Sequence, residues 1–183
     1  MNALKQRYFE TIREELKTKL GVTNVMQVPS LKKIVINMGV RDAVMDKKHI
    51  ERASESLATI AGQKPRVAKA KKSIAGFKVR EGDAIGLIVT LRGERMYSFI
   101  DKLITIVFPR LRDFHGVKRT SFDPRGNYTL GMTESAVFPE IDPAQAERVQ
   151  GLEVSFVISG GTKEGGYALL EALGMPFEKE VAS

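Results

Sequence analysis

Short segments in which apolar and polar residues alternate constrain this chain most strongly. The clearest runs from residue 152 to residue 158 and reads LEVSFVI. Its inward positions are Leu152, Val154, Phe156 and Ile158. This period of two is typical of a strand that buries one face. The same pattern recurs at 31–40, 85–93 and 126–132, so the chain is expected to form a sheet of half-exposed strands.

Helical patterns lie between these strands. Residues 3–20 carry an apolar residue every four positions before Gly21, and 46–61 form an apolar stripe before Gly62. Residues 94–108 predict a strongly apolar helix that ends at Pro109, and Thr162 is expected to cap a last short helix. Half-polar strands argue against a sheet that is buried on both faces. We therefore expect an α+β fold in a single domain, 1–183: a largely antiparallel sheet with helices on one face and an open second face.

The alternation also predicts which side chains lie on the open face. These are Lys33, Asn37, Thr90, Arg92, Asn127 and Thr129. The set is polar and contains no acid, so it is a plausible platform for an RNA backbone and its sugar edges.

A basic stretch, residues 64–80, accounts for the net charge of the chain. It contains seven Lys or Arg and no Asp or Glu. When these seven are subtracted from the 29 basic residues of the chain, 22 remain, which equals the number of acidic residues. Charge concentrated in one segment attracts phosphate-rich partners. A solvated surface loop is the alternative interpretation.

Small residues separate the charges of this stretch, so a partner could approach its backbone closely. Ile74 and Phe77 lie at its centre. An exposed Phe77 would suit stacking on a base or sugar, whereas a buried one would hold the loop against the core. Seven phosphate contacts would give a salt slope of roughly −0.9 per contact on duplex RNA or DNA.

Other segments are weaker candidates. The glycine-rich segment 160–166 precedes a helix, where such loops can cradle phosphate, but it lacks the spacing of known phosphate-binding motifs. A flexible turn with a Thr162 cap is the simpler interpretation. Arg125 lies in a turn set by Pro124 and Gly126, which suits a phosphate contact and equally suits an ordinary hairpin. His49 and His115 lack metal-ligand spacing, so no metal or cofactor is expected.

The composition favours a cytoplasmic protein. Cysteine is absent, which fits a reducing compartment. The first 21 residues lack the apolar region of a signal peptide, and no run approaches the ~18 apolar residues of a membrane span. No membrane partner is expected.

Four long motifs together resemble one known family. They read GQKPRVAKAKKSIAGFKVREG, IGLIVTLRGERMYSFIDKLI, PRLRDFHG and SFDPRGNYTLG, in this order. They are similar to the bacterial large-subunit ribosomal proteins numbered five, which bind 5S rRNA in the central protuberance. The resemblance implies a structural, non-enzymatic protein of the large subunit that also contacts 23S rRNA, the P-site tRNA and the neighbouring 5S-binding proteins.

The resemblance assigns roles to residues of this chain. It implies 5S rRNA contacts by Asn37, Gln63 and Thr90. With the neighbouring polar and basic positions, the predicted 5S site is Lys33, Asn37, Gln63, Lys64, Arg66, Thr90 and Arg92. The family's tRNA-contacting loop matches the protruding basic loop 71–83. Its predicted contacts are Lys71, Lys72, Ser73, Ile74, Gly76, Phe77, Lys78 and Arg80. Arg125 and Asn127 are further predicted RNA contacts.

The family also touches small-subunit head protein number thirteen in an intersubunit bridge, which we place near FPEIDPAQAERVQ, residues 138–150. Three segments depart from the family pattern. TESAVFPEI removes a basic contact near Thr133, SGGTKEGG replaces a charged turn, and PFEKEVAS makes RNA contact by the C-terminal tail unexpected.

Two rival hypotheses remain beside the ribosomal one. The chain could be an RNA-binding regulator that works off the ribosome, or a nucleotide-dependent enzyme that uses the glycine-rich segment for phosphate. Binding to large subunits through a high-salt wash would favour the ribosomal role.

Overall fold

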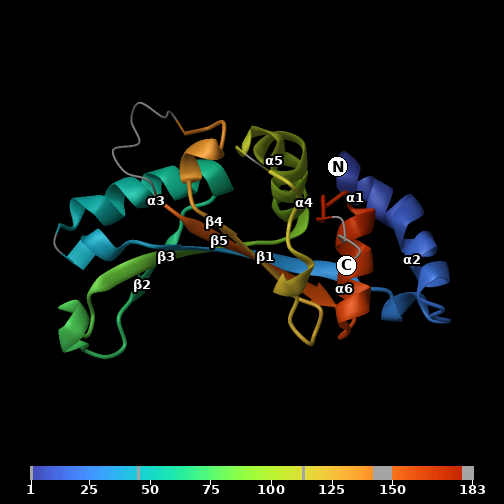
Figure 1. The fold of residues 1–183 in the computed structure, drawn as a ribbon, viewed down its shortest axis with the longest axis horizontal. Coiled ribbons are helices and arrows are strands. Elements are labelled where there is room, and N and C mark those ends of the chain that lie inside the picture. Colours follow the sequence, from blue (N-terminus) through green and yellow to red (C-terminus); the bar gives the residue numbers. More distant parts are fainter. Residues whose placement is uncertain (1, 45, 113, 142–149, 179–183) are drawn as a thin grey trace. The chain divides into compact units, whose positions relative to one another are not determined.

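The computed structural model describes residues 2–44, 46–112, 114–141 and 150–178. It confirms the α+β prediction, with an antiparallel sheet of five strands in the order β2-β3-β1-β5-β4 (Figure 1). The strands are β1 Ser30–Gly39, β2 Arg66–Lys69, β3 Ala84–Leu91, β4 Tyr128–Met132 and β5 Leu152–Ser159.

The chain divides into two compact units. Unit 1 comprises residues 1–34, 91–130 and 155–183, and unit 2 comprises residues 35–90 and 131–154. The divisions fall within strands of the sheet, at residues 34/35, 90/91, 130/131 and 154/155. The single domain 1–183 stays a prediction.

Unit 1 begins with the expected amphipathic helix. It comprises α1 Ala3–Arg7, a π-helical turn Tyr8–Ile12 and α2 Arg13–Lys19. The Oδ1 atom of Asn2 accepts a hydrogen bond from the Leu4 N–H at 2.8 Å, which caps a free donor of the first turn. Its apolar stripe is buried at Leu4, Tyr8, Ile12 and Leu16. α1 contacts α4, Gly93–Lys102, and α2 contacts α6, Lys163–Ala172.

The second long helix of unit 1 continues past its expected end. α4 runs through a π-helical turn, Leu103–Val107, into α5, Phe108–Arg110. Pro109 lies in the first turn of α5 and the helix ends at Arg110. Proline is accepted where its missing N–H is not needed by the hydrogen-bond ladder. A 3-10 turn, Arg119–Ser121, follows in this unit.

Unit 2 contains α3, Lys48–Ala61, which lies along one side of β3 (Figure 1). The helix is preceded by a 3-10 turn, Arg41–Val44, and ends at Gly62, whose φ of 63° suits glycine. It starts at Lys48 because the Asp46 carboxylate accepts a hydrogen bond from the Lys48 N–H at 2.9 Å. Another 3-10 turn, Ser135–Val137, completes the unit.

The strand alternation is confirmed in this unit. The side chains that face its core are Ile36, Met38, Leu87 and Val89, all buried. Asn37 and Ile88 lie between them in sequence and are exposed. The sequence had predicted no strand in the basic stretch, yet Arg66–Lys69 form β2. Apart from Val67, its residues have little β-propensity, so pairing with β3 stabilises this strand.

Candidate nucleic-acid interface

The basic stretch forms the first strand and the tip of a hairpin in unit 2. β2 pairs with β3, with Arg66 opposite Ile88 and a bulge between Ala68 and Lys69 (Figure 1). Beyond the strands, the Ala70 N–H donates to the Asp83 carbonyl oxygen at 2.8 Å. We call the segment Ala70–Asp83 the basic hairpin. Its backbone is held by internal hydrogen bonds along most of its length, which the sequence alone did not predict.

The tip of the basic hairpin exposes two apolar side chains. Ile74 and Val79 exchange backbone hydrogen bonds of 2.9 and 3.2 Å, and a 3-10 turn, Ala75–Phe77, closes the end. Phe77 is 67% exposed and Ile74 is 49% exposed. Of the two arrangements considered for Phe77, the structure has the exposed one.

The charges of the basic hairpin have no acidic partners among the described residues. No ion pair there involves Lys71, Lys72, Lys78 or Arg80. The hairpin contains two acids, Glu81 and Asp83, and the Asp83 carboxylate accepts a hydrogen bond from the backbone N–H of Arg80 at 2.7 Å. The Ser73 hydroxyl accepts from the Glu81 N–H at 2.9 Å. These bonds shape the backbone and leave the cationic side chains in solvent, where they can meet phosphate.

A second group of predicted contacts lies on the open side of unit 2. Asn37 is exposed on β1, and Thr90 is half-buried near the end of β3. Gln63 precedes β2, and its Nε2 donates to the Thr90 carbonyl oxygen at 3.5 Å. Lys64 and Arg66 are exposed beside it. A single unit therefore holds Asn37 and Thr90 together with the start of the basic stretch.

The sequence reasoning overlooked an acidic residue on this side. Glu153 follows Leu152 in β5 and is exposed. With Asn37, Thr133 and several glycines it lines a shallow hollow of about 440 Å³ in unit 2. The alternation of LEVSFVI already placed Glu153 opposite the buried positions, so this residue was predictable. The open side is therefore polar but not free of acids.

The remaining predicted contacts belong to unit 1. Lys33 is half-buried on β1, and Arg92 is exposed immediately before α4. Arg125 is exposed in a turn organised by Asp123, whose carboxylate accepts from the backbone N–H groups of Arg125 and Asn127 at 2.9 and 2.7 Å.

Asn127 has a structural role in that turn. Its Nδ2 donates to Asp123 at 2.7 Å, and its Oδ1 accepts from the Ile158 N–H at 3.0 Å. The side-chain hydrogen bond from Asn127 is the main reason that the pKa of Asp123 is lowered. The prediction that Asn127 lies on the open face therefore omitted its structural role, because its amide joins the turn to β5.

The glycine-rich segment is explained by packing. The Thr162 hydroxyl accepts from the Gly165 N–H at 3.1 Å, which confirms the predicted cap of α6. A Cβ on Gly166 would overlap the Gly126 carbonyl oxygen, and one on Gly165 would lie 2.9 Å from Pro29. These glycines allow backbone segments to approach closely, which favours the turn interpretation over a phosphate cradle.

Two further predictions concern sites outside these surfaces. Within the described ranges, no cluster of three potential metal ligands occurs and no helix is long and apolar enough to cross a membrane. In the proposed bridge segment 138–150, Phe138 is buried and Pro139 and Glu140 are exposed, while 142–149 lie outside the described residues.

Comparison with known proteins covers nearly the whole chain. Residues 24–80 match the family model described as Ribosomal protein L5, and residues 84–177 match the model of the C-terminus of the same ribosomal family. The chain is 54% identical to the large ribosomal subunit protein uL5 of Streptococcus pyogenes serotype M49, over 97% of this chain and 99% of the relative. The uL5 proteins of Streptococcus equi subsp. zooepidemicus and Streptococcus uberis show the same identity and coverage.

Proposed function

The chain belongs to the ribosomal protein L5 family, and from that premise we propose that its two unit 2 surfaces bind two different RNAs. As a family member it is a structural, rRNA-binding protein of the large ribosomal subunit that takes part in translation in the cytoplasm. The finer assignment concerns which surface meets which partner.

The open side of unit 2 binds 5S rRNA in this proposal. Asn37, Gln63 and Thr90 supply amide and hydroxyl groups suited to sugar edges and bases, and Lys64 and Arg66 supply phosphate contacts. Lys33 and Arg92 of unit 1 are proposed as separate 5S rRNA contacts, with Arg125 as a further phosphate contact. Recognition of this kind relies on RNA shape and 2′-hydroxyls more than on base sequence.

The basic hairpin contacts the P-site tRNA in this proposal. The observation that carries it is the exposed hairpin itself, whose four cations lack acidic partners in the described ranges and whose tip exposes Phe77. Cations position a nucleic acid backbone, and an exposed ring stacks on a base or sugar.

Further partners are assigned by family alone. We propose contacts with 23S rRNA and the neighbouring 5S-binding proteins, and a bridge to small-subunit head protein number thirteen near residues 138–150. The packing of Gly165 and Gly166 argues against the nucleotide-dependent enzyme.

Gel-shift titration of 5S rRNA, with tRNA as competitor over a series of salt concentrations, tests this division. We expect 5S rRNA to bind with the shallower salt dependence and tRNA to fail to displace it. Full displacement by tRNA at equal concentration would show one shared site and contradict the proposal.

A further inference from the structure

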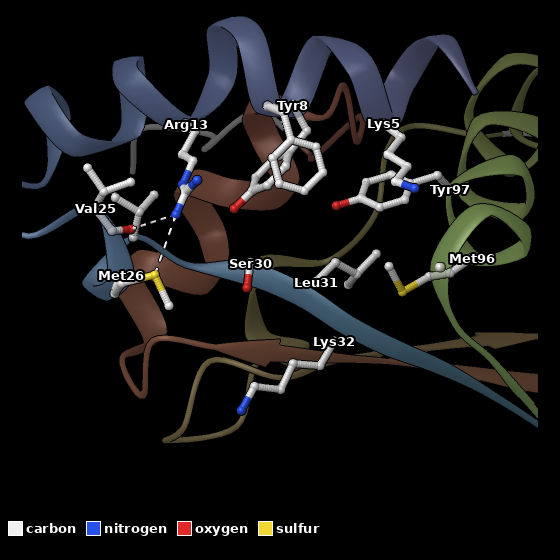
Figure 2. A pocket seen from close by; sticks show the side chains of 13 residues that line it. Lys5, Tyr8, Arg13, Val25, Met26, Ser30, Leu31, Lys32, Met96 and Tyr97 are labelled. Carbon is white, nitrogen blue, oxygen red and sulfur yellow. Dashed lines mark hydrogen bonds between the residues drawn. The ribbon is translucent and has the colours of Figure 1, made fainter. Parts of the chain in front are cut away.

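A second hollow, to which no contact has been assigned, lies in unit 1. It has a volume of about 290 Å³ and lies between the first helix, the 3-10 turn Val25–Gln27, β1 and α4 (Figure 2). Ligand sites of small molecules start at about 300 Å³. We call it the α1–β1 hollow. It has room for one nucleotide-sized group and is too small for a duplex.

One polar group in the hollow has no partner among the described residues. Tyr97 is 4% exposed, and its hydroxyl makes no hydrogen bond within the described part of the chain. Figure 2 shows this hydroxyl pointing into the space between the helix and β1, on the side of Tyr8. The Tyr8 hydroxyl differs, because it donates to the Pro29 carbonyl oxygen at 2.9 Å. The hydroxyl oxygen itself is accessible from the hollow, so a ligand there that supplies an acceptor would form a hydrogen bond with it.

The Tyr97 hydroxyl is protonated at neutral pH, as that of an ordinary tyrosine is. Desolvation, with a smaller contribution from Tyr8, raises the pKa of Tyr97 to about 12. At neutral pH the group therefore offers a proton to an acceptor such as a base carbonyl or a ribose oxygen.

The rim of the hollow combines exposed apolar side chains with positive charge. Phe9 is 52% exposed and Met26 is 81% exposed, although both are large hydrophobic residues. The Arg13 Nη2 lies 3.5 Å from the Val25 carbonyl oxygen and 3.8 Å from the Met26 sulfur, and no acid pairs with Arg13 within the described ranges (Figure 2). Lys5 adds a second cation, with Glu94 at 3.8 Å. No acidic residue lines the hollow within the described part of the chain.

We propose that the α1–β1 hollow binds one unstacked nucleotide of a single-stranded RNA segment. Tyr97 donates a hydrogen bond to its base or ribose, Phe9 and Met26 cover its flat face, and Arg13 contacts its phosphate. An apolar side chain of a protein partner fits less well, because it would leave the Tyr97 hydroxyl buried without an acceptor. This site lies in unit 1 and does not depend on the 5S rRNA assignment made for unit 2.

Photocrosslinking tests the site directly. The probe is an oligouridylate that contains 4-thiouridine, and the protein carries neutral residues at Lys71, Lys72, Lys78 and Arg80 to suppress binding by the basic hairpin. We expect crosslinks at Phe9 or Met26, and fewer of them with a duplex of the same length. Crosslinks elsewhere, or equal crosslinking by duplex, would overturn the proposal.

Variants separate binding from folding. Tyr97→Phe removes only the unpaired hydroxyl, so the thermal midpoint should not fall while affinity for the oligouridylate falls about threefold to tenfold, the range for one hydrogen bond. Phe9→Ala should also weaken binding. Ile106→Ala is the control and should leave binding unchanged, because this apolar side chain of unit 1 is 42% exposed and does not line the hollow.

Unchanged affinity for the oligouridylate in Tyr97→Phe and Phe9→Ala would refute the assignment. Displacement of the RNA by an acidic, Phe-containing peptide that binds more tightly would also refute it. The 5S rRNA gel shift of the same variants should be unchanged if unit 2 supplies that site. A failure here therefore differs from a failure of the proposed function.

Discussion

Neutralising the tip of the basic hairpin should remove one RNA contact without unfolding the protein. The variant replaces Lys71, Lys72 and Arg80 with Ser and Lys78 with Asn, because Lys78 has a φ of 54° and asparagine tolerates this left-handed conformation better than serine. All four side chains are exposed, and none forms an ion pair within the described ranges. Each replacement should therefore change the free energy of unfolding by no more than about 0.5 kcal/mol.

The expected loss of binding follows from the number of charges removed. If each cation meets one phosphate of folded tRNA, the slope of log affinity against log salt becomes shallower by up to about 3.6, at about 0.9 per contact. Salt raised from about 50 mM to about 200 mM weakens binding by both proteins. The fold-loss of affinity would then be about a hundred times larger for the parent protein than for the variant.

Fluorescence anisotropy with labelled tRNA over a salt series measures both slopes. A control that replaces Arg41, Lys47, Lys48 and Arg52 removes the same charge from exposed positions of the same unit. The control slope should stay close to that of the parent protein. Equal slopes for the two variants would show that total charge matters and not the hairpin, which would refute the reasoning.

Three further predictions test single features. Phe77→Ala should leave the thermal midpoint unchanged, because the side chain is 67% exposed, and should weaken tRNA binding by about 1–3 kcal/mol; a lowered midpoint would show that the ring supports the fold. Gly126→Ala should lower the free energy of unfolding, measured in urea, by about 3 kcal/mol or more, because its Cβ would overlap the Thr162 carbonyl oxygen. Gly161→Ala is the control: its Cβ would have open space, so the loss should be about 1 kcal/mol. Similar losses in the two variants would contradict this account. An NMR titration should place the pKa of Asp123 below its ordinary value, and Asn127→Ala should raise it. Because the folded-state pKa is lowered, the stabilisation is present above the unfolded-state pKa and disappears as pH falls through the folded-state pKa. No pKa change in Asn127→Ala would exclude the proposed hydrogen bond as its cause.

The strands and helix ends could be predicted because their causes are local. Alternation placed Leu87 and Val89 inward and Asn37 outward, and Gly62 ended a helix where a left-handed residue was required. Glu153 was equally readable from the same alternation and was overlooked. Local periodicity therefore accounts for most of the sheet.

Features that depend on distant residues were not predictable. β2 exists because Arg66 pairs across to Ile88, which no local pattern indicates. The inward amide of Asn127 depends on Ile158, 31 positions away. The α1–β1 hollow likewise combines three separate segments, so no local sequence pattern indicated a binding role for Tyr97. Only the folded chain shows which polar groups are already satisfied.

The central claim is that the open side of unit 2 binds 5S rRNA. The most direct measurement compares the 5S rRNA affinity of the parent protein with that of a variant carrying Asn37→Ala, Gln63→Ala and Thr90→Ala. A control carries Ser54→Ala, Ser56→Ala and Thr59→Ala on α3, and circular dichroism checks the fold of both variants. We predict that affinity falls about tenfold or more in the first variant and stays unchanged in the control, because lost hydrogen bonds cost about 0.5–1.5 kcal/mol each. Unchanged 5S rRNA affinity in a folded first variant would contradict the account.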